Sequence, residues 1–533
     1  MGTMWPDRIE QTIEMRRRQK EGGGREKVER QHQRGKMTAW ERVEFLLDPG
    51  TFHPFGTFYE TRKDQDSLSR RQPYLGDGML TGWGEINGRP VCVAASEFTV
   101  AGGSLGEVQA EKICRIQDLA YERKIPIVFL DDSGGARIEE GIMALNGYGK
   151  IFCRHVKASG VIPQIAAILG PCSGGACYSG ALCDFIFMVK GVSQMCLTGP
   201  QVVEAVLGQK VTLEELGGSK VHSEASGVAH ALYEDERSCL NGIRKLLGYL
   251  PENSGEEAVK EQRARILKEG IPASRRKQPE KKQTYPPFEE LVPANPRSVY
   301  DIHKVIEKLL GNESFFEIQK HFAPNAVVGL GIFDRRVLGI VANQPAHLGG
   351  ALDCDASDKI TRFVRFCDCF GIPLLTLVDV PAFFPGEAQE RAGIIRHGAK
   401  ILYGYAEACV PKVTLILRKA YGGAYIAMNC RTLGADAVYA WPIAEIAVMG
   451  AEGAVRILNR KELQNAQDPE GEFRQRKQEY QDAFSNPFLA AKKGAVDEIL
   501  LPEETIERLS RTFRLLEGKK ADPFSKRHGN MPV

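Results

Sequence analysis

Two short loops of small residues stand out as places where backbone groups could do chemistry. Gly174-Gly175-Ala176 and Gly422-Gly423-Ala424 each directly follow an apolar, strand-like run. Small residues let a ligand approach the backbone, and the first N–H groups of a helix have no partner within that helix. Two such groups that converge on one oxygen form an oxyanion hole, with roughly 2.7–4 kcal/mol from each donor. Close strand–helix packing would explain one such loop, but two equivalent loops favour catalysis.

Two further glycine-rich segments could hold another part of a ligand. One contains Gly102 and Gly103 and follows a strand-like run that ends near Ser96. The other is Ser133-Gly134-Gly135-Ala136-Arg137, which Asp132 joins to the apolar run at residues 125–131. Neither is a Walker A sequence, but each could cradle a phosphate or a pantetheine arm.

No side chain stands out as a nucleophile, a catalytic acid pair or a metal ligand. Ser173 does not lie in the Gly-x-Ser-x-Gly sequence of a nucleophile elbow. Asp131 and Asp132 are adjacent on a predicted strand, so they should point to opposite faces and hydrogen-bond neighbouring loops. The cysteines lack the paired C-x2-C spacing of structural zinc sites. We therefore expect no metal in this chain.

The two Gly-Gly-Ala loops lie at equivalent places in two similar halves. The apolar runs at residues 125–131 and 162–169 precede the first loop, and the runs at 372–379 and 410–417 precede the second. The offset between the halves is about 250 residues, which indicates duplicated domains rather than short repeats. Strand-like and helical segments alternate in each half, which predicts an α/β fold.

The composition of successive segments predicts where the domains begin and end. We expect a charged N-terminal arm at residues 1–36, interrupted by Gly22-Gly23-Gly24. The first domain would cover 37–255 and the second 297–533, and a polar, proline-containing linker at 256–296 would join them.

The overall composition excludes several classes of protein. The 533 residues carry a net charge of +2, and 43% of them are hydrophobic, which gives no global electrostatic reason to bind nucleic acid. No apolar run approaches the ~20 residues of a membrane span, and the N-terminus lacks the apolar core of a secretory signal. The 13 cysteines, an odd number, indicate reduced thiols rather than a disulfide framework. We expect a cytoplasmic protein without direct membrane insertion.

Longer motifs match a known family. They are the segments 29–39, 132–141, 160–176, 393–400, 418–425 and 439–451. Together they make the chain resemble the carboxyltransferase β subunits of propionyl-CoA carboxylase. The chain is equally similar to the large subunits of methylmalonyl-CoA decarboxylase and methylmalonyl-CoA transcarboxylase. The resemblance extends from about Val28 to Pro532 and covers nearly the whole chain.

The resemblance implies two tandem crotonase-like (ClpP/crotonase superfamily) domains of α/β fold, related by internal duplication. It also implies a homohexamer, a trimer of dimers, with active sites where the first domain of one subunit meets the second domain of its partner. The amides of Gly174, Gly175 and Ala176 would hold the thioester oxygen as an enolate. Those of Gly422, Gly423 and Ala424 would hold the biotin ureido oxygen. Substrate contacts would come from Gly102, Gly103, Ser133, Gly134, Gly135, Ala136, Arg137, Tyr178, Arg391 and Ile426.

The implied function is transfer of CO2 from carboxybiotin to the α-carbon of a short-chain acyl-CoA through an enolate. The chain has no biotin-attachment Met-Lys-Met sequence and no ATP-binding loop. Biotin would therefore arrive on a carrier protein and be carboxylated by a biotin carboxylase subunit. The two developing anions need two oxyanion holes, and no catalytic side chain is strictly required.

Two alternatives remain open. The same site could run in reverse as a malonyl-, methylmalonyl- or glutaconyl-CoA decarboxylase or as a transcarboxylase subunit. A biotin-independent crotonase-type hydratase or thioesterase would need a carboxylate in the first-domain pocket and would leave the second loop without a role.

Departures from the family pattern concern the acyl group. Ile426 stands where propionyl-specific relatives carry Asp, and Arg391 stands where they carry Tyr. We therefore expect an acyl group other than propionyl, either larger or with a polar end that Arg391 meets.

Overall fold

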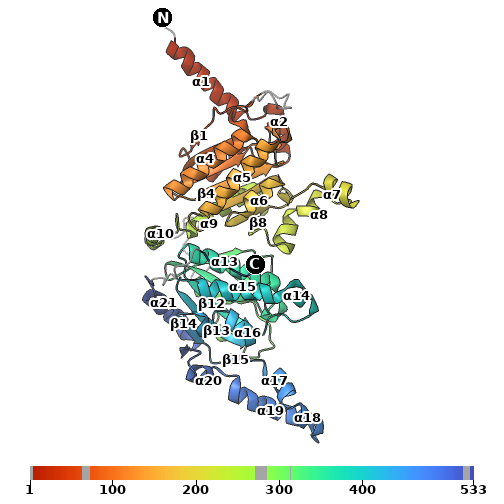
Figure 1. Ribbon diagram of the computed structural model, residues 1–533. Coiled ribbons are helices and arrows are strands. Elements are labelled where there is room, and N and C mark those ends of the chain that lie inside the picture. Colours follow the sequence, from red (N-terminus) through yellow and green to blue (C-terminus); the bar gives the residue numbers. More distant parts are fainter. Residues whose placement is uncertain (1–3, 63–72, 270–284, 312–313, 520–527) are drawn as a thin grey trace. The chain divides into compact units, whose positions relative to one another are not determined.

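The computed structural model describes residues 4–62, 73–269, 285–311, 314–519 and 528–533. The chain divides into two units, with the boundary near residue 270 (Figure 1). This boundary falls within the predicted linker, of which residues 270–284 lie outside the described part. Each unit has its own sheet and its own buried core.

The first unit is built on an eight-stranded sheet with the order β1-β2-β3-β4-β5-β6-β8, and β7 pairs with β5. The strands are β1 (His53–Phe55), β2 (Met79–Ile86), β3 (Arg89–Ser96), β4 (Ile127–Ser133), β5 (Gln164–Ser173), β6 (Phe185–Val189), β7 (Gln194–Cys196) and β8 (Ala231–Tyr233). β1, β2 and β3 pair antiparallel, whereas β3 to β6 are parallel. The parallel strands are largely apolar because helices cover both faces, and their polar residues lie mostly at the strand ends.

Helices α4 (Glu107–Arg123), α5 (Ile142–Ala158) and α6 (Gly175–Ala181) cover one face of this sheet (Figure 1). Beneath them lies a core that includes Ile127, Phe129 and Tyr148. Helices α3 (Ala39–Leu46) and α9 (Glu236–Tyr249) cover the other face. The remaining helices are α7 (Pro200–Leu207), α8 (Leu213–Gly217) and α10 (Glu256–Glu269).

The N-terminal segment forms two helices, α1 (Met4–Lys20) and α2 (Arg25–Gln33). No residue of α1 is buried, and Figure 1 shows it projecting from the first unit. Gly22 and Gly24 between the helices have φ of 54° and 97°, which favour glycine. Gly22, Gly23 and Gly24 thus separate the two helices, and the bounds of the arm at residues 1–36 stay a prediction.

The second unit repeats this plan with the order β16-β14-β13-β12-β11-β10-β9, and β15 pairs with β13. Its strands are β9 (Phe315–Ile318), β10 (Ala326–Phe333), β11 (Arg336–Asn343), β12 (Leu374–Val380), β13 (Lys412–Tyr421), β14 (Ala437–Ala440), β15 (Glu445–Ala447) and β16 (Glu498–Ile499). Helices α13 (Cys354–Cys369), α15 (Ile394–Glu407) and α16 (Gly422–Ala427) pack in the same succession as α4, α5 and α6.

The other helices of the second unit complete its core and surface. α12 (Ile302–Leu310) and α21 (Thr505–Leu515) pack against the face opposite α13, in a core that includes Trp441. The remainder are α11 (Phe288–Leu291), α14 (Glu387–Ala392), α17 (Ala451–Leu458), α18 (Arg460–Asn465), α19 (Pro469–Phe484) and α20 (Pro487–Lys492). Among the described residues, no helix is long and apolar enough to cross a bilayer.

The matching sheet orders confirm the predicted α/β fold with two related domains. Even an unusual core feature is duplicated. Lys112 on α4 and Lys359 on α13 are both buried, and each ammonium group donates to backbone carbonyls, at 2.9 Å to Gly76 and 2.7 Å to Phe322. A buried lysine is stabilised only where such acceptors replace water.

The strand before the first loop is longer than the apolar run at residues 162–169. β5 continues to Ser173 because Pro171, Cys172 and Ser173 pair with the short strand β7. The second unit does the same, because Lys419 to Tyr421 pair with β15. The Gly-Gly-Ala loops therefore begin directly at the end of a strand that has a partner, which fixes their backbone position.

Candidate active site

β5 presents the first Gly-Gly-Ala loop at its end, and α6 begins within that loop. Gly174 has a φ of +59°, a conformation that favours glycine. Its N–H donates to the Cys196 carbonyl at 3.0 Å. The N–H groups of Gly175 and Ala176 form no backbone hydrogen bond to any described residue. Two of the three predicted donors are therefore available to an oxygen, and the amide of Gly174 is not.

β13 presents the second loop in the same way, ahead of α16. Gly422 has a φ of +57°, and a side chain there would approach the Val448 carbonyl to 3.0 Å. Val448 directly follows β15, as Leu197 follows β7 beside Gly174. Within the described chain, the N–H groups of Gly423 and Ala424 make no backbone hydrogen bond either. Both loops thus present paired donors on the same framework.

The predicted substrate loops lie against the first Gly-Gly-Ala loop. The Gly134 N–H donates to the Gly102 carbonyl at 2.9 Å, and a side chain on Gly135 would meet the Ser173 carbonyl at 3.0 Å. Gly103 packs directly on the Asp132 carbonyl, and Leu105 bridges to Ala136. The glycines let three backbones approach one another, so Gly102 to Gly103 and Ser133 to Ala136 gather at one edge of the sheet.

Arg137 braces these loops rather than facing solvent. It is 5% exposed, and its Nη1 lies 2.8 Å from Asp77 and 2.6 Å from Glu140. Its Nη2 donates to the Ser104 carbonyl at 3.0 Å. A guanidinium with these partners supports the loop, so the geometry does not favour the predicted substrate contact.

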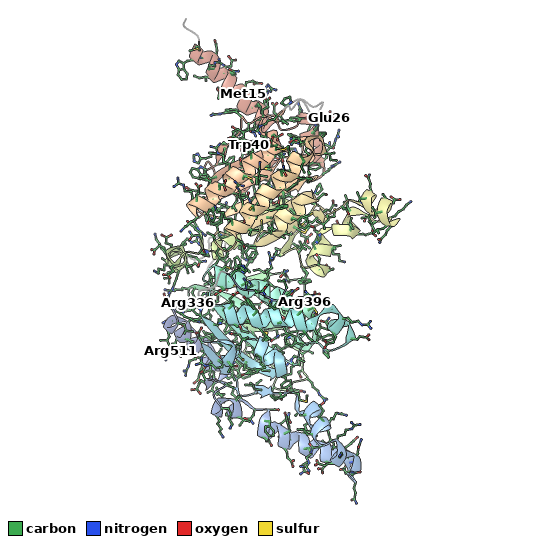
Figure 2. All side chains as sticks on the ribbon, in the orientation of Figure 1. Met15, Glu26, Trp40, Arg336, Arg396 and Arg511 are labelled. Atoms are coloured by element: carbon green, nitrogen blue, oxygen red, sulfur yellow. The ribbon has the colours of Figure 1, made fainter. Side chains whose placement is uncertain are left out.

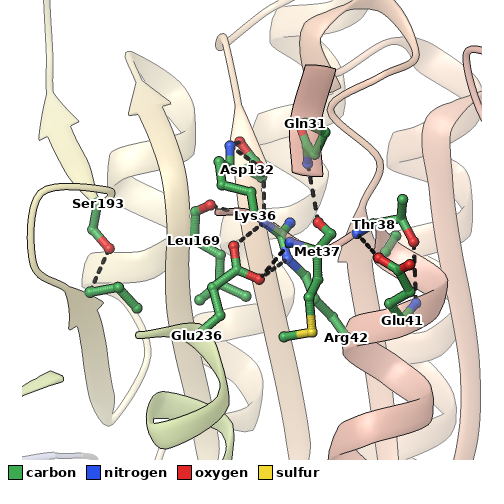
Figure 3. A network of polar contacts seen from close by, with 12 residues as sticks. Gln31, Lys36, Met37, Thr38, Glu41, Arg42, Asp132, Leu169, Ser193 and Glu236 are labelled. Atoms are coloured by element: carbon green, nitrogen blue, oxygen red, sulfur yellow. Dashed lines mark hydrogen bonds and ion pairs between the residues drawn. The ribbon is translucent and has the colours of Figure 1, made fainter. Parts of the chain in front are cut away.

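A buried ionic network supports the first site from beneath (Figure 3). Asp132, at the end of β4, is fully buried and accepts from Arg42 Nη2 at 3.0 Å and from Lys36 Nζ at 2.8 Å. Arg42 also pairs with Glu236 at 2.6 Å. Lys36 and Arg42 therefore balance the negative charge of Asp132. The backbone carbonyl of the same residue packs against Gly103.

The second unit places Asp379 at the equivalent position but supplies its cations differently. Arg418 Nε donates to Asp379 at 3.0 Å, and Lys419 lies 3.3 Å away. Arg418 stands on β13, four residues before Gly422, where the first unit has Gly170 four residues before Gly174. A side chain on Gly170 would collide with Asp132 Oδ1. The absence of that side chain makes room for Lys36 and Arg42.

Asp131 lies on the opposite face of β4 from Asp132, as predicted for neighbouring strand residues. It interacts electrostatically with Tyr148, Cys172 and Cys177, close to the first loop. Its Oδ2 is buried and has no hydrogen-bond partner among the described residues. Burial raises the pKa of Asp131 to about 7, and the charge of Asp132 adds to this effect. The second unit has Val378 at this position, so the acid is specific to the first unit.

Three predicted substrate residues are exposed. Tyr178 and Ile426 each stand two residues after the alanine of their loop and are 51% and 44% exposed. Arg391 on α14 has a side chain that is 79% exposed and pairs with Glu387 at 2.6 Å. All three are accessible to a ligand, and their contact with substrate remains a prediction.

Other reactive side chains near the first loop are engaged within the fold. His155 is fully buried between Gln164 (2.8 Å) and Ser179 (2.9 Å), and burial lowers the pKa of this histidine to about 4. Cys177 Sγ donates to the Cys172 carbonyl at 2.9 Å. In the described part of the chain, no three His, Cys, Asp or Glu residues gather as a metal site.

Comparison with known proteins identifies the family to which the chain belongs. A family profile described as the carboxyl transferase domain matches residues 30–531. The chain belongs to the carboxyl transferase family. It is 49% identical to the propionyl-CoA carboxylase carboxyltransferase subunit of Haloferax mediterranei, over 99% of each chain. It is 47% identical to methylmalonyl-CoA decarboxylase subunit alpha of Propionigenium modestum, over 96% of each chain.

A solved structure of this family agrees with the fold. The crystal structure of a transcarboxylase 12S hexamer, with methylmalonyl-CoA and methylmalonic acid bound, matches with a TM-score of 0.91 and 44% identity. The match covers 100% of this chain and 99% of that one. These similarities confirm the predicted family, the crotonase-like fold and the carboxyltransferase function.

Sequence reasoning missed the residues that support the first candidate site from within. Lys36, Arg42 and Glu236 were not singled out, although Lys36 lies in a matching motif at residues 29–39. A signal was available where the two halves differ. The first half has glycine at position 170, where the second half has arginine at the equivalent position 418. This difference indicates that the cation beside Asp132 comes from another part of the chain.

Proposed function

We propose that the chain is the carboxyltransferase subunit of a biotin-dependent acyl-CoA carboxylase, which transfers CO2 from carboxybiotin to the α-carbon of a short-chain acyl-CoA. The observation that carries the proposal is the pair of equivalent loops, each with unpaired N–H donors at the end of a sheet strand. A reaction that develops negative charge on two different oxygens needs two such sites.

In the first unit, the N–H groups of Gly175 and Ala176 would bind the thioester oxygen. Loss of the α-proton moves negative charge onto that oxygen, and fixed donors stabilise the resulting enolate more than the neutral thioester. The glycines at 102, 103, 134 and 135 leave the surrounding loops without side chains, so an extended acyl-pantetheine chain can approach the donors.

In the second unit, the loop fits the ureido group of biotin. Gly423 is exposed, and the N–H groups of Gly423 and Ala424 make no backbone hydrogen bond to any described residue. Carboxybiotin, carried on a partner protein, would supply CO2 and then the base that takes the α-proton. In this proposal the N–H groups of Gly423 and Ala424 bind the ureido oxygen, and Gly422 provides the turn that orients them.

The proposal extends to the assembly. We propose a homohexamer with active sites shared between subunits, served by a biotin carboxylase and a biotin carrier subunit. The hexamer named for the transcarboxylase 12S relative supports the first part. The family of biotin-dependent carboxylases supports the second.

A carboxyl-transfer assay with the purified chain tests the proposal. Methylmalonyl-CoA or malonyl-CoA with free biotin should lose its carboxyl group, and carboxylated carrier should carboxylate acetyl-, propionyl- or butyryl-CoA. Comparing both directions separates a carboxylase subunit from a decarboxylase or transcarboxylase subunit. Hydration or hydrolysis of acyl-CoA without biotin would favour the crotonase-type alternative. A folded oligomer that transfers nothing with any acyl-CoA would contradict the proposal.

The acyl preference would depend on Ile426, which lies exposed beside the second loop. Ile426→Asp should change the ratio of kcat/KM between propionyl-CoA and a longer acyl-CoA by roughly tenfold, because it removes apolar contact and adds charge. Tyr178→Phe keeps the bulk of the equivalent position in the first unit and serves as the control. An unchanged ratio in Ile426→Asp would place the preference elsewhere.

A further inference from the structure

Two cysteines flank the first Gly-Gly-Ala loop. Cys172 is the next-to-last residue of β5, and Cys177 lies in the first turn of α6, so that only residues 173–176 separate them. Both are free thiols and both are buried, with 0% of Cys172 and 7% of Cys177 exposed. The proposed function gives neither of them a role.

The two thiols are in direct contact. Cys177 Sγ donates to the Cys172 carbonyl at 2.9 Å, and the two side chains also hydrogen-bond to each other. Cys177 Sγ lies 3.4 Å from the Cys196 carbonyl, which accepts the Gly174 N–H at 3.0 Å. The Cys177 thiol therefore contacts the same carbonyl that fixes the turn at Gly174, and a change at this sulfur acts directly on the loop.

The contact makes the two thiols unequal in reactivity. The hydrogen bond with Cys172 lowers the pKa of Cys177, although burial opposes this effect. The same hydrogen bond, together with burial, raises the pKa of Cys172. The thiolate is the reactive form of cysteine, so Cys177 is the sulfur that reacts first with an oxidant, and Cys172 remains a thiol beside it.

The second unit has no thiol at the equivalent positions. Ala420 and Tyr425 stand before and after Gly422 as Cys172 and Cys177 stand before and after Gly174. Figure 2 shows the side chains of both units and labels Arg396 on α15. Cys354, a buried cysteine of the second unit, interacts with this arginine and lies 4.0 Å from the Gln389 carbonyl. At these equivalent positions, paired thiols occur in the first unit alone.

We infer that Cys172 and Cys177 form a reversible disulfide when a peroxide reaches them, and that this disulfide inactivates the first Gly-Gly-Ala loop. Formation of the bond depends only on the two thiols. Its effect on activity rests on the proposed function, in which the first loop holds the thioester oxygen.

The oxidation consumes one peroxide for each disulfide. The Cys177 sulfur attacks a peroxide oxygen, the O–O bond breaks, and the departing oxygen takes up the thiol proton, which leaves a sulfenic acid. The Cys172 sulfur then attacks the sulfenic sulfur, the S–O bond breaks, and that oxygen leaves as water with the Cys172 proton. Each sulfur loses one electron and each peroxide oxygen gains one, so hydrogen peroxide yields one disulfide and two waters. A dithiol reductant reverses the reaction by thiol–disulfide exchange and is itself oxidised.

The disulfide would displace the donors of the first loop. Its sulfurs are ~2.05 Å apart, closer than two hydrogen-bonded thiols can lie. Oxidation also removes the proton that Cys177 donates to the Cys172 carbonyl. The start of α6 must therefore shift against the end of β5. The N–H groups of Gly175 and Ala176, which lie between the two cysteines in the chain, shift with it.

Differential labelling of the full-length chain tests whether the disulfide forms. After treatment with hydrogen peroxide, iodoacetamide in denaturant blocks the free thiols, dithiothreitol reduces disulfides, and N-ethylmaleimide labels the thiols that are released. Trypsin cleaves after Lys157 and Lys190, so Cys172, Cys177 and Cys183 lie on one peptide. Mass spectrometry should find maleimide on Cys172 and Cys177 and the iodoacetamide adduct on Cys183. Peptides without maleimide on the first two cysteines would overturn the inference.

Carboxyl transfer before and after peroxide tests the effect on the loop. The wild type should lose activity about tenfold or more, because the donors of the proposed oxyanion hole move, and dithiothreitol should restore it. Cys177→Ser keeps a hydrogen-bond donor but cannot form the disulfide, so its activity after peroxide should stay within roughly twofold of its own untreated activity. Cys177→Ala provides a second variant with the same expectation. A loss as large as that of the wild type in both variants would overturn the inference.

Cys354→Ser is the matched control, because it removes a buried thiol from the second unit. It should lose activity with peroxide as the wild type does, and protection by this change would contradict the assignment to the first loop. A disulfide that forms without changing carboxyl transfer would also overturn the inference. Labelling needs no turnover, so a wild type that forms the disulfide but transfers no carboxyl group in either redox state would overturn the proposed function alone.

Discussion

The two units support equivalent aspartates in different ways. Asp132 in the first unit takes its cations from the N-terminal part of the chain, with Arg42 on α3 separated from it by 90 residues. Asp379 in the second unit takes its principal cation, Arg418, from the neighbouring strand β13, which also presents the Gly-Gly-Ala loop. The loop geometry is the same in both units, although the charges beneath it come from different elements.

The difference shows which part of the duplicated fold is constrained. An acid at the end of β4 or β12 needs a buried cation, because an uncompensated buried charge costs several kcal/mol. The cation can come from any element that reaches this position. The positive φ of Gly174 and Gly422, in contrast, occurs in both copies, because the turn depends on the backbone itself.

Removal of Arg418 should have the largest effect on this comparison. Arg418→Met would leave Asp379 paired only with Lys419 and would break three hydrogen bonds to the carbonyls of Pro293, Asn295 and Ser298. We expect a loss of about 3–5 kcal/mol in the free energy of unfolding, measured by urea denaturation. Arg511→Met, which breaks only a surface pair with Glu507, should cost less than about 1 kcal/mol. Equal stability of the two variants would contradict the role assigned to Arg418.

The glycine that replaces Arg418 in the first unit offers the next test. In Gly170→Ala, the new methyl group would collide with Asp132 Oδ1 and lie 2.5 Å from Lys36 Nζ. We expect a loss of roughly 1–3 kcal/mol from overpacking. Gly149→Ala, on α5 with open space around it, should be neutral or stabilising by up to about 1 kcal/mol. If thermal unfolding cannot distinguish these variants, the space at Gly170 is not needed for the cations.

The middle glycines of the two loops should tolerate alanine differently. A methyl group on Gly175 would lie 2.7 Å from the Tyr148 ring, whereas on Gly423 it would lie 3.9 Å from the Phe383 ring. Gly175→Ala should therefore displace the start of α6 and reduce carboxyl transfer about tenfold or more, because the proposed donors of the oxyanion hole move. Gly423→Ala should keep its wild-type unfolding midpoint. Loss of stability in Gly423→Ala alone would reverse the comparison.

Asp131 occupies the position that corresponds to Val378 in the second unit, and its replacement should change stability in a way that depends on pH. Burial raises its pKa to about 7 in the folded protein, so the folded state holds a proton that the unfolded chain has already lost. Stability should fall as pH rises from about 4 to about 7 and stay low above that. Asp131→Asn should remove this loss, with a gain of up to roughly 4 kcal/mol at pH 8, because a rise of about three pKa units corresponds to ~1.4 kcal/mol per unit, and no gain near pH 4. A gain of equal size at both pH values would exclude ionisation as its cause. Carboxyl transfer should continue in this variant, since the proposed reaction assigns Asp131 no proton.

The sequence allowed the backbone framework to be predicted because that framework depends on local patterns. Apolar runs of strand length, glycine loops after them and a repeat of about 250 residues predicted the two α/β domains and placed both Gly-Gly-Ala loops. The opposite directions of Asp131 and Asp132 followed from strand alternation alone.

The interactions that support the loops could not be predicted, because they join residues far apart in the chain. Nothing in the local sequence assigns Arg42 to Asp132 or commits the Gly174 amide to Cys196. The continuation of β5 to Ser173 depends on β7, which lies more than a helix away in the chain. Arg137 was expected to contact substrate because it lies in a glycine-rich motif of the family. Only the tertiary structure shows that its guanidinium is bound to Asp77 and Glu140.

The pairing of Arg42 with Glu236 has a consequence for protein synthesis. The two residues are 194 positions apart and join α3, near the start of the first unit, to α9, near its end. A nascent chain that has not yet reached Glu236 leaves Arg42 without one of its two acidic partners. The first unit therefore completes its charge balance only when the ribosome has made nearly all of it, whereas Asp379 meets Arg418 only 39 residues later. Shortened versions of the first unit should include both Lys36 and Glu236 if they are to fold.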